Sequence, residues 1–120
     1  MPETLFERCG GAPGVSRLVM ALYDRVLVDD RLHGFFAETD MRRLVDHHAK
    51  FLSALMGGPA GYDERLLADV HAGLGIAERD FAAMLDALRA TLAEGELSPE
   101  EIARVLARYQ AYKAVVVQEP

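Results

Sequence analysis

Residues 40–55 read DMRRLVDHHAKFLSAL, and the spacing of their apolar side chains predicts an α-helix. Apolar residues recur at intervals of three and four, which places them on one face of a helix. This face consists of Met41, Leu44, Val45, Phe51, Leu52 and Leu55. Asp40 directly precedes it and is a favourable N-cap, because its carboxylate can accept hydrogen bonds from the first amides of the helix. Gly57, Gly58 and Pro59 break the helix after its last turn.

The rest of the chain has the same helical spacing, and no run alternates apolar and polar residues as a half-buried strand does. Further helices are expected over about 4–9, 13–28, 64–72, 76–93 and 99–116, with an irregular or single-turn segment over 31–39. Ser98 and Glu101 form a capping box around Pro99, the strongest helix start in the chain. Pro13 is likewise expected at the first position of its helix. The sequence therefore predicts one all-α domain over residues 1–120.

The composition limits the classes of partner. A chain of 120 residues, of which 51% are hydrophobic and 27% charged, suits one soluble folded domain. Its net charge of −6 argues against binding to nucleic acid or to an anionic membrane surface. Cys9 has no partner for an internal disulfide, which favours a reducing compartment. No stretch reaches the roughly 18 apolar residues of a membrane span, and the acidic first residues do not resemble a signal peptide. We expect a cytoplasmic protein with neither a nucleic-acid nor a membrane partner.

His48 lies in the middle of the apolar face of the 40–55 helix. An imidazole buried there needs a hydrogen-bond or metal partner, because leaving it unpaired costs about 1–3 kcal/mol. His47 lies at the edge of the same face. The simplest interpretation of this helix alone is a hydrogen-bonded core histidine beside a solvated one.

His71 is a second unusual residue. It follows Val70 near the end of the short helix expected over 64–72, just before Gly73. A short helix between two glycine-rich breaks adds little to a core by itself, which makes a ligand role more plausible for this histidine. Neutral imidazole is a good ligand for iron and zinc.

Tyr23 lies at the edge of the apolar face of the 13–28 helix, where a phenol commonly points its hydroxyl into a cavity or to water. Phe35 and Phe36 lie together at a turn. Each feature alone is typical of an ordinary helical core. Together with two histidines on apolar helices, they suit a flat apolar cofactor with one axial histidine, and haem fits that description. The sequence has neither the cysteine pairs of a thiolate zinc site nor a glycine motif for nucleotide phosphates.

Five segments, taken together and in order, resemble the group I truncated haemoglobins. They are TLFERCGG at 4–11, LYDRV at 22–26, Phe35-Phe36 followed by Asp40-Met41, Phe51-Leu52 through Gly57-Gly58-Pro59, and VHAGLGI at 70–76. The resemblance extends from Thr4 to about Val116. It implies a shortened globin fold, in which two helices stack over two and enclose one haem.

The resemblance also implies roles for individual residues. His71 resembles the proximal iron ligand, and Tyr23 resembles the distal tyrosine that donates a hydrogen bond to the oxygen ligand. Phe36 resembles the phenylalanine stacked on the porphyrin, whereas Arg43 and Tyr62 match partners of the haem propionates less closely. The apolar haem contacts that it implies are Phe51, Leu52, Leu67, Val70, Ile76, Phe81, Met84 and Leu88.

The distal pocket, implied to hold Tyr23, Leu44 and His48, departs from the common pattern of the family. Many members have glutamine at the position of His48, and glutamine or leucine at that of Leu44. His47 resembles the sixth iron ligand of some cyanobacterial relatives, which implies a six-coordinate resting iron through His47, with His48 as competitor. Adjacent residues point about 100° apart on a helix, so both rings cannot face the iron at once. Some of those cyanobacterial relatives also attach haem covalently through a histidine in the last helix; because no histidine follows His71, the resemblance implies one non-covalent haem b.

The resemblance implies a protein that binds oxygen, nitric oxide or carbon monoxide at ferrous iron, and it leaves the biological role open. One hypothesis is the conversion of nitric oxide and oxygen to nitrate, which needs an external reductase because the chain has no flavin or nicotinamide motif. Another is oxygen storage or transport without turnover. A third is electron transfer or gas sensing by a bis-histidine haem with an external partner. We expect the protein to be a monomer.

Overall fold

The computed structural model describes residues 3–59 and 62–118, and all regular secondary structure in these ranges is helical. The longer helices are α2 (Gly11–Val26), α3 (Met41–Leu55), α5 (Glu78–Ala93) and α6 (Pro99–Gln110). The shorter elements are α1 (Leu5–Arg8), the 3-10 helix η1 (His33–Phe36), α4 (Glu64–His71) and α7 (Lys113–Val116). The all-α prediction is confirmed. None of the helices in the described ranges combines the length and apolar character needed to cross a membrane.

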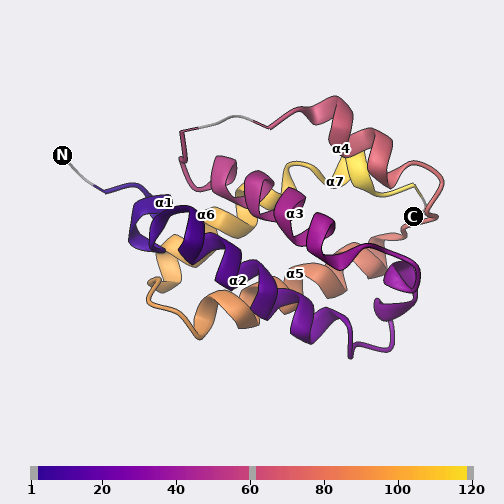
Figure 1. Cartoon of the computed structure of the whole chain (residues 1–120), viewed down its shortest axis with the longest axis horizontal. Coiled ribbons are helices and arrows are strands. Elements are labelled where there is room, and N and C mark those ends of the chain that lie inside the picture. Colours follow the sequence, from indigo (N-terminus) through magenta and orange to yellow (C-terminus); the bar gives the residue numbers. More distant parts are fainter. Residues whose placement is uncertain (1–2, 60–61, 119–120) are drawn as a thin grey trace.

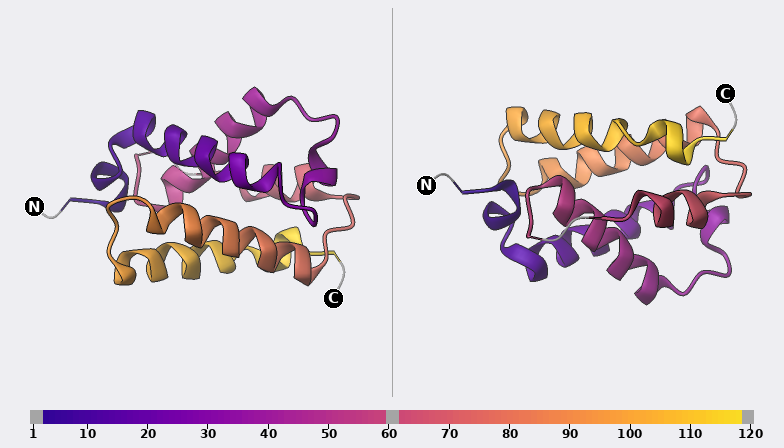
Figure 2. Two further views of the ribbon diagram at one scale, coloured as in Figure 1. Left: turned by 90° about the horizontal axis from the view of Figure 1, so that it is seen from below. Right: turned by 90° about the horizontal axis from the view of Figure 1, so that it is seen from above.

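The longer helices form two pairs that lie one over the other. α2 packs against α3, and α5 packs against α6. Contacts of α2 with α5 and of α3 with α6 join the pairs, and both views in Figure 2 place them on opposite sides of the molecule. α4 lies beside α7 (Figure 1). This is the two-over-two arrangement that the family resemblance implies.

The close-packed core lies where the two pairs meet. Its fully buried large side chains are Val15, Val19, Leu22, Val26, Leu52, Met56, Leu88, Leu92 and Val105. Burying one such side chain contributes about 1.5–3 kcal/mol to stability. The apolar faces visible in the sequence are therefore the faces that hold the two helix pairs together.

Two helix starts follow the predicted capping chemistry. The Asp40 carboxylate accepts a hydrogen bond from the Arg43 amide, 3.3 Å away, at the start of α3. At the start of α6, the Ser98 hydroxyl accepts from the Glu101 amide at 3.2 Å, while the Glu101 carboxylate accepts from the Ser98 amide at 2.8 Å. These reciprocal bonds satisfy amides that have no partner inside the helix.

The start of α2 differs from the prediction. The helix begins at Gly11 and not at Pro13, because Gly10 adopts a φ of +92° and turns the chain directly from α1 into α2. Pro13 lies inside the first turn, where the missing amide removes no helical hydrogen bond. A Cβ on Gly14 would lie 1.7 Å from the Cys9 carbonyl oxygen, so only glycine permits this close approach.

The start of α5 is also later than predicted. Ile76 lies outside the helix, which begins at Glu78. The Ile76 amide donates to the Gln118 side-chain oxygen at 3.1 Å, and the Ile76 carbonyl accepts from the Gln118 amide at 2.8 Å. The Ala77 amide donates to the Asp80 carboxylate at 2.9 Å. These partners outside the helix hold Ile76 in the preceding turn.

The single helix predicted over 99–116 is in fact two. α6 ends at Gln110 and α7 begins at Lys113, although no glycine or proline marks the break. α7 packs against α4, and Lys113 forms an ion pair with Glu78 at the start of α5. The break therefore allows α7 to pack against α4 and to pair with the start of α5. The remaining helix bounds agree with the predicted ones to within two residues.

Candidate functional site

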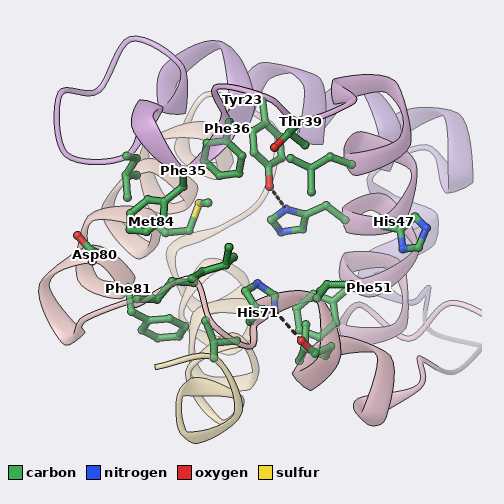
Figure 3. A pocket seen from close by; sticks show the side chains of 18 of the residues that line it. Tyr23, Phe35, Phe36, Thr39, His47, Phe51, His71, Asp80, Phe81 and Met84 are labelled. Atoms are coloured by element: carbon green, nitrogen blue, oxygen red, sulfur yellow. Dashed lines mark hydrogen bonds between the residues drawn. The ribbon is translucent and has the colours of Figure 1, made fainter. Parts of the chain in front are cut away.

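A cavity of about 510 Å³ lies among η1 and the helices α2 to α7. Its volume falls within the range of small-molecule and cofactor sites. The predicted site residues that line it are Tyr23, Phe36, Arg43, Leu44, His47, His48, Phe51, Tyr62, Leu67, Val70, His71, Ile76, Phe81 and Met84. The fold thus brings residues from widely separated parts of the chain to one apolar cavity (Figure 3).

The structure does not bring Leu52 and Leu88 to this cavity, which corrects their expected placement as haem contacts. Both side chains are fully buried in the core, together with those of α2. Phe51, which directly precedes Leu52, does line the cavity, and so does Met84, which lies one helical turn before Leu88. The apolar face of a helix is wide enough to contact two different neighbours, and its periodicity does not separate them.

The proximal side of the cavity is built around His71, the last residue of α4. Its Nδ1 lies 2.7 Å from the Leu67 carbonyl oxygen, one helical turn back. A carbonyl oxygen only accepts, so Nδ1 carries the proton and donates it. Nε2 is then left with its lone pair, which is the form in which imidazole binds a metal ion.

The distal side holds Tyr23 from α2 and His48 from α3, and Figure 3 places Tyr23 across the cavity from His71. The Tyr23 hydroxyl lies 2.8 Å from His48 Nδ1. A third residue completes the group, because the Tyr109 hydroxyl from α6 lies 3.2 Å from His48 Nε2. Both nitrogens of the His48 ring therefore have phenol partners.

These three distal groups are uncharged at neutral pH. Burial lowers the pKa of His48 to about 4, and the proximity of His71 is a smaller cause in the same direction. Burial raises the pKa of Tyr23 well above its usual value, with Tyr109 as a second cause. Burial also raises the pKa of Tyr109. Charged forms are disfavoured here because the apolar surroundings cannot solvate them.

Tyr109 is the main site residue that the sequence did not reveal. It stands in the apolar face of α6 and is only 8% exposed, so its spacing in the sequence is that of an ordinary core side chain. A buried phenol hydroxyl requires a partner, and that requirement is the signal that would have singled it out. The other lining residues outside the predicted set are Leu32, Phe35, Thr39, Asp40, Leu74, Asp80, Tyr112 and Val116.

His47 and His48 differ in direction, as expected for neighbours on a helix. His48 is hydrogen-bonded inside the cavity. His47 is half-buried and contributes to the cavity wall, with its ring directed away from Tyr23 and His71 (Figure 3). Within residues 3–59 and 62–118, the His47 ring forms no hydrogen bond.

Arg43 and Tyr62 supply polar atoms to a largely apolar lining. Arg43 is exposed near the start of α3, so its guanidinium can reach a carboxylate at the cavity. Tyr62 is half-buried and packs edge-on against Phe51, with ring centroids 5.1 Å apart. Burial raises the pKa of its phenol, and the neighbouring Asp63 adds to this shift. Both residues are suitable hydrogen-bond donors for an anionic group.

The donor set and the lining fit a haem. One wall presents an imidazole nitrogen with a lone pair, and the opposite wall presents a phenol hydroxyl. Val70 and Leu74 line the cavity yet remain 48% and 45% exposed, so an apolar ligand would bury side chains that the protein itself leaves uncovered. A single nitrogen ligand above an apolar, aromatic cavity matches haem ligation better than it matches a cage of several metal ligands.

Comparison with known proteins agrees with this geometry. The chain matches the family of bacterial-like globins over residues 4–118. It is 38% identical over 109 residues to the group 1 truncated hemoglobin GlbN of Synechocystis sp., with 88% of each chain aligned. It is 34% identical over 99 residues to the group 1 truncated hemoglobin of Tetrahymena thermophila, with 82% of each aligned.

Solved structures give the same result. The crystal structure of truncated hemoglobin from Tetrahymena pyriformis, in its Fe(III) form, has a TM-score of 0.87 at 28% identity and covers 96% of this chain and 98% of that one. A 2/2 hemoglobin from Synechococcus sp. with covalently attached heme has a TM-score of 0.80 at 27% identity, covering 95% and 98%. The chain thus belongs to the bacterial-like globins and, among them, to the group 1 truncated haemoglobins.

Proposed function

We propose that this protein binds one haem b non-covalently, through His71, and uses it to bind oxygen and other diatomic gases. Membership of the truncated haemoglobins supports haem-based gas binding in general. The observation that carries the proposal for this chain is the 2.7 Å contact between His71 Nδ1 and the Leu67 carbonyl oxygen. In the neutral ring, that contact places the proton on Nδ1 and leaves Nε2 free to bind a metal.

Haem, when bound, would supply a ferrous iron able to bind a diatomic gas. The protein contributes the proximal nitrogen and its orientation. Because Leu67 accepts from Nδ1 within the same helix, the imidazole remains in the tautomer that a metal requires, and the hydrogen bond increases the basicity of Nε2. α4 therefore acts as the support of the axial ligand.

On the distal side, Tyr23 is the proposed donor to the gas. Its hydroxyl has one proton and two lone pairs, so it can accept from His48 Nδ1 while donating into the cavity. Phe36 packs edge-on against the Tyr23 ring, with ring centroids 5.5 Å apart, and Leu44 lines the same cavity. Hydrogen bonds of this kind favour oxygen over carbon monoxide, because oxygen takes on more negative charge when it binds ferrous iron.

Arg43 and Tyr62 are the proposed partners of the two haem propionates. Both line the cavity and carry donors, and an exposed guanidinium can pair with a carboxylate. The absence of histidine after His71 supports a non-covalent cofactor, in contrast to the covalently attached heme of the Synechococcus structure. The chain also has no flavin or nicotinamide motif, so any turnover of nitric oxide requires an external reductase.

The test is reconstitution with haem followed by spectroscopy. Titration of the apoprotein with hemin should reach saturation at one haem per chain, and the dithionite-reduced protein should form a carbonyl complex. Acid–butanone extraction should remove all of the haem, which distinguishes non-covalent from covalent attachment. If the protein gives no saturable Soret band at stoichiometric hemin, haem-based gas binding is wrong for this chain.

We also predict that His47 is the sixth ligand of the resting iron. His48 is the weaker competitor, because both of its nitrogens already have phenol partners, whereas the His47 ring has no hydrogen bond within the described residues. Since the His47 ring is directed away from Tyr23 and His71, α3 must shift to bring it to the iron. The ferric protein should be low-spin, and His47→Ala should make it high-spin. A wild-type protein that is already high-spin contradicts this assignment.

A further inference from the structure

The group formed by Tyr23, His48 and Tyr109 joins three helices that are distant in sequence. Tyr23 lies in α2, His48 in α3 and Tyr109 in α6, and the two contacts measure 2.8 and 3.2 Å. The two tyrosines are 4% and 8% exposed, so both lie inside the protein, where they line the cavity. His48 stands between them with one nitrogen toward each.

We propose that Tyr109 sets the tautomer of His48, and that this tautomer decides whether Tyr23 donates its proton into the cavity or to the His48 ring. Tyr109 is then a positioning residue, which acts on the proposed gas donor Tyr23 through His48. The significance for gas binding rests on the proposed function, whereas the hydrogen-bond arrangement itself is a property of the polypeptide.

The argument follows from the number of protons available. A neutral imidazole has one N–H group and one nitrogen lone pair, and each phenol has one O–H group. If Nδ1 is protonated, it donates to the Tyr23 oxygen, Tyr109 donates to Nε2, and the Tyr23 proton is free to point into the cavity. If Nε2 is protonated, it donates to the Tyr109 oxygen, and Tyr23 donates its proton to Nδ1.

The proposed role of Tyr23 selects the first arrangement. Both tyrosines line the cavity, and within the described residues each hydroxyl has only His48 as a hydrogen-bond partner, so the unused proton of either arrangement can turn to the cavity. In the first arrangement that proton belongs to Tyr23, the proposed donor to the gas or to a water in its place. We therefore expect protonation at Nδ1.

Tyr109→Phe should reverse this preference. A phenol is a stronger donor than a neutral imidazole N–H, and an imidazole nitrogen is a stronger acceptor than a phenol oxygen. In the first arrangement the substitution thus removes the stronger bond, from the Tyr109 hydroxyl to Nε2. In the second arrangement it removes only the weaker bond, from Nε2 to the Tyr109 oxygen. His48 should become protonated at Nε2, and Tyr23 should then donate to His48 and no longer into the cavity.

The direct test is ¹⁵N NMR of the His48 ring, which distinguishes a protonated from an unprotonated nitrogen. We expect protonation at Nδ1 in the wild-type apoprotein and in its ferrous carbonyl complex, and protonation at Nε2 in Tyr109→Phe. Tyr112→Phe is the matched control: it removes a hydroxyl from the same cavity wall, but Tyr112 has no hydrogen bond to His48. Wild-type protein protonated at Nε2, or an unchanged tautomer in Tyr109→Phe, overturns the proposal.

A second measurement separates this role from simple packing. In Tyr109→Phe, the oxygen dissociation rate should rise about two- to tenfold, the range expected for one neutral hydrogen bond. In a His48→Leu background, the same substitution should have no further effect, because the residue through which it acts is gone. An equal rise of the oxygen dissociation rate in both backgrounds means that Tyr109 contributes only through packing. The apoprotein spectrum tests the tautomer even if the chain takes up no haem, so failure of this proposal and failure of the haem assignment are distinguishable.

Discussion

The two walls of the cavity use the same side chain in opposite ways. On the proximal wall, His71 makes one hydrogen bond to the backbone of its own helix and keeps one nitrogen unengaged. On the distal wall, both nitrogens of His48 are engaged, and the partners are side chains from two other helices. A backbone carbonyl can only accept, so it fixes a tautomer. Phenol hydroxyls can donate or accept, so they leave the tautomer adjustable.

This comparison shows that a histidine's role depends on how many of its ring nitrogens the protein engages. The location of each ring supports the same reading. His71 ends a short helix in which Leu67 is the buried residue, whereas His48 lies on a long helix packed between α2 and α6. The proximal wall thus presents a ligand, and the distal wall presents a hydrogen-bond network.

The largest expected effect comes from removing the proximal nitrogen. His71→Ala should abolish stable haem binding at stoichiometric hemin, and added imidazole should restore part of it by occupying the same position. The matched control is His33→Ala, because His33 is exposed on η1 and does not line the cavity. Hemin titration monitored at the Soret band measures both variants. A His71→Ala protein with the wild-type spectrum refutes the proximal assignment.

The second prediction concerns the pH dependence of the apoprotein. The pKa of His48 falls from 6.5 to about 4 on folding, so between these values the unfolded state binds the extra proton. The stability contribution of the neutral ring is therefore complete above pH 6.5 and is lost as the pH falls toward 4. At 1.36 kcal/mol per pKa unit, the loss is roughly 3 kcal/mol.

Urea unfolding of the apoprotein at several pH values measures this loss. Carboxylates also titrate near the lower end of this window, so the useful quantity is the difference between wild type and His48→Gln. The wild-type unfolding free energy should decrease more steeply between pH 6.5 and 4 than that of the variant. Parallel pH profiles are inconsistent with a buried, neutral His48.

Much of this architecture is visible in the sequence, because helical periodicity and glycine breaks fix where the helices lie. The position of His48 in an apolar face and of His71 before Gly73 singled out both residues, and the resemblance to the truncated haemoglobins implied their roles. Tyr109 was missed because periodicity reports that a face is buried but not what it faces. The same limit explains why Leu52 and Leu88 were expected at the cavity although they lie in the core. Three-dimensional packing also causes the break between α6 and α7, for which the sequence has no local signal.

A smaller effect is expected from the distal donor. Tyr23→Phe removes a hydrogen bond to a ligand that carries partial negative charge, which is worth about 1.5–3 kcal/mol. The oxygen dissociation rate should therefore rise by about one to two decades. Stopped-flow displacement of oxygen by carbon monoxide measures this rate. An unchanged rate in Tyr23→Phe means that His48 or a water molecule is the donor.

The smallest effect should come from Arg43. Its guanidinium is exposed, and exposed ion pairs contribute at most about 1 kcal/mol, so Arg43→Gln should increase the haem dissociation rate no more than about fivefold. The effect should shrink as salt is added, because salt screens a charge pair in water. Arg42→Gln is a close control, since Arg42 carries the same charge one residue earlier, is also exposed and does not line the cavity. Haem transfer to an excess of a haem-scavenging apoprotein measures both rates. Equal rates for the two variants mean that Arg43 acts only through the overall charge of the protein and not as a propionate partner.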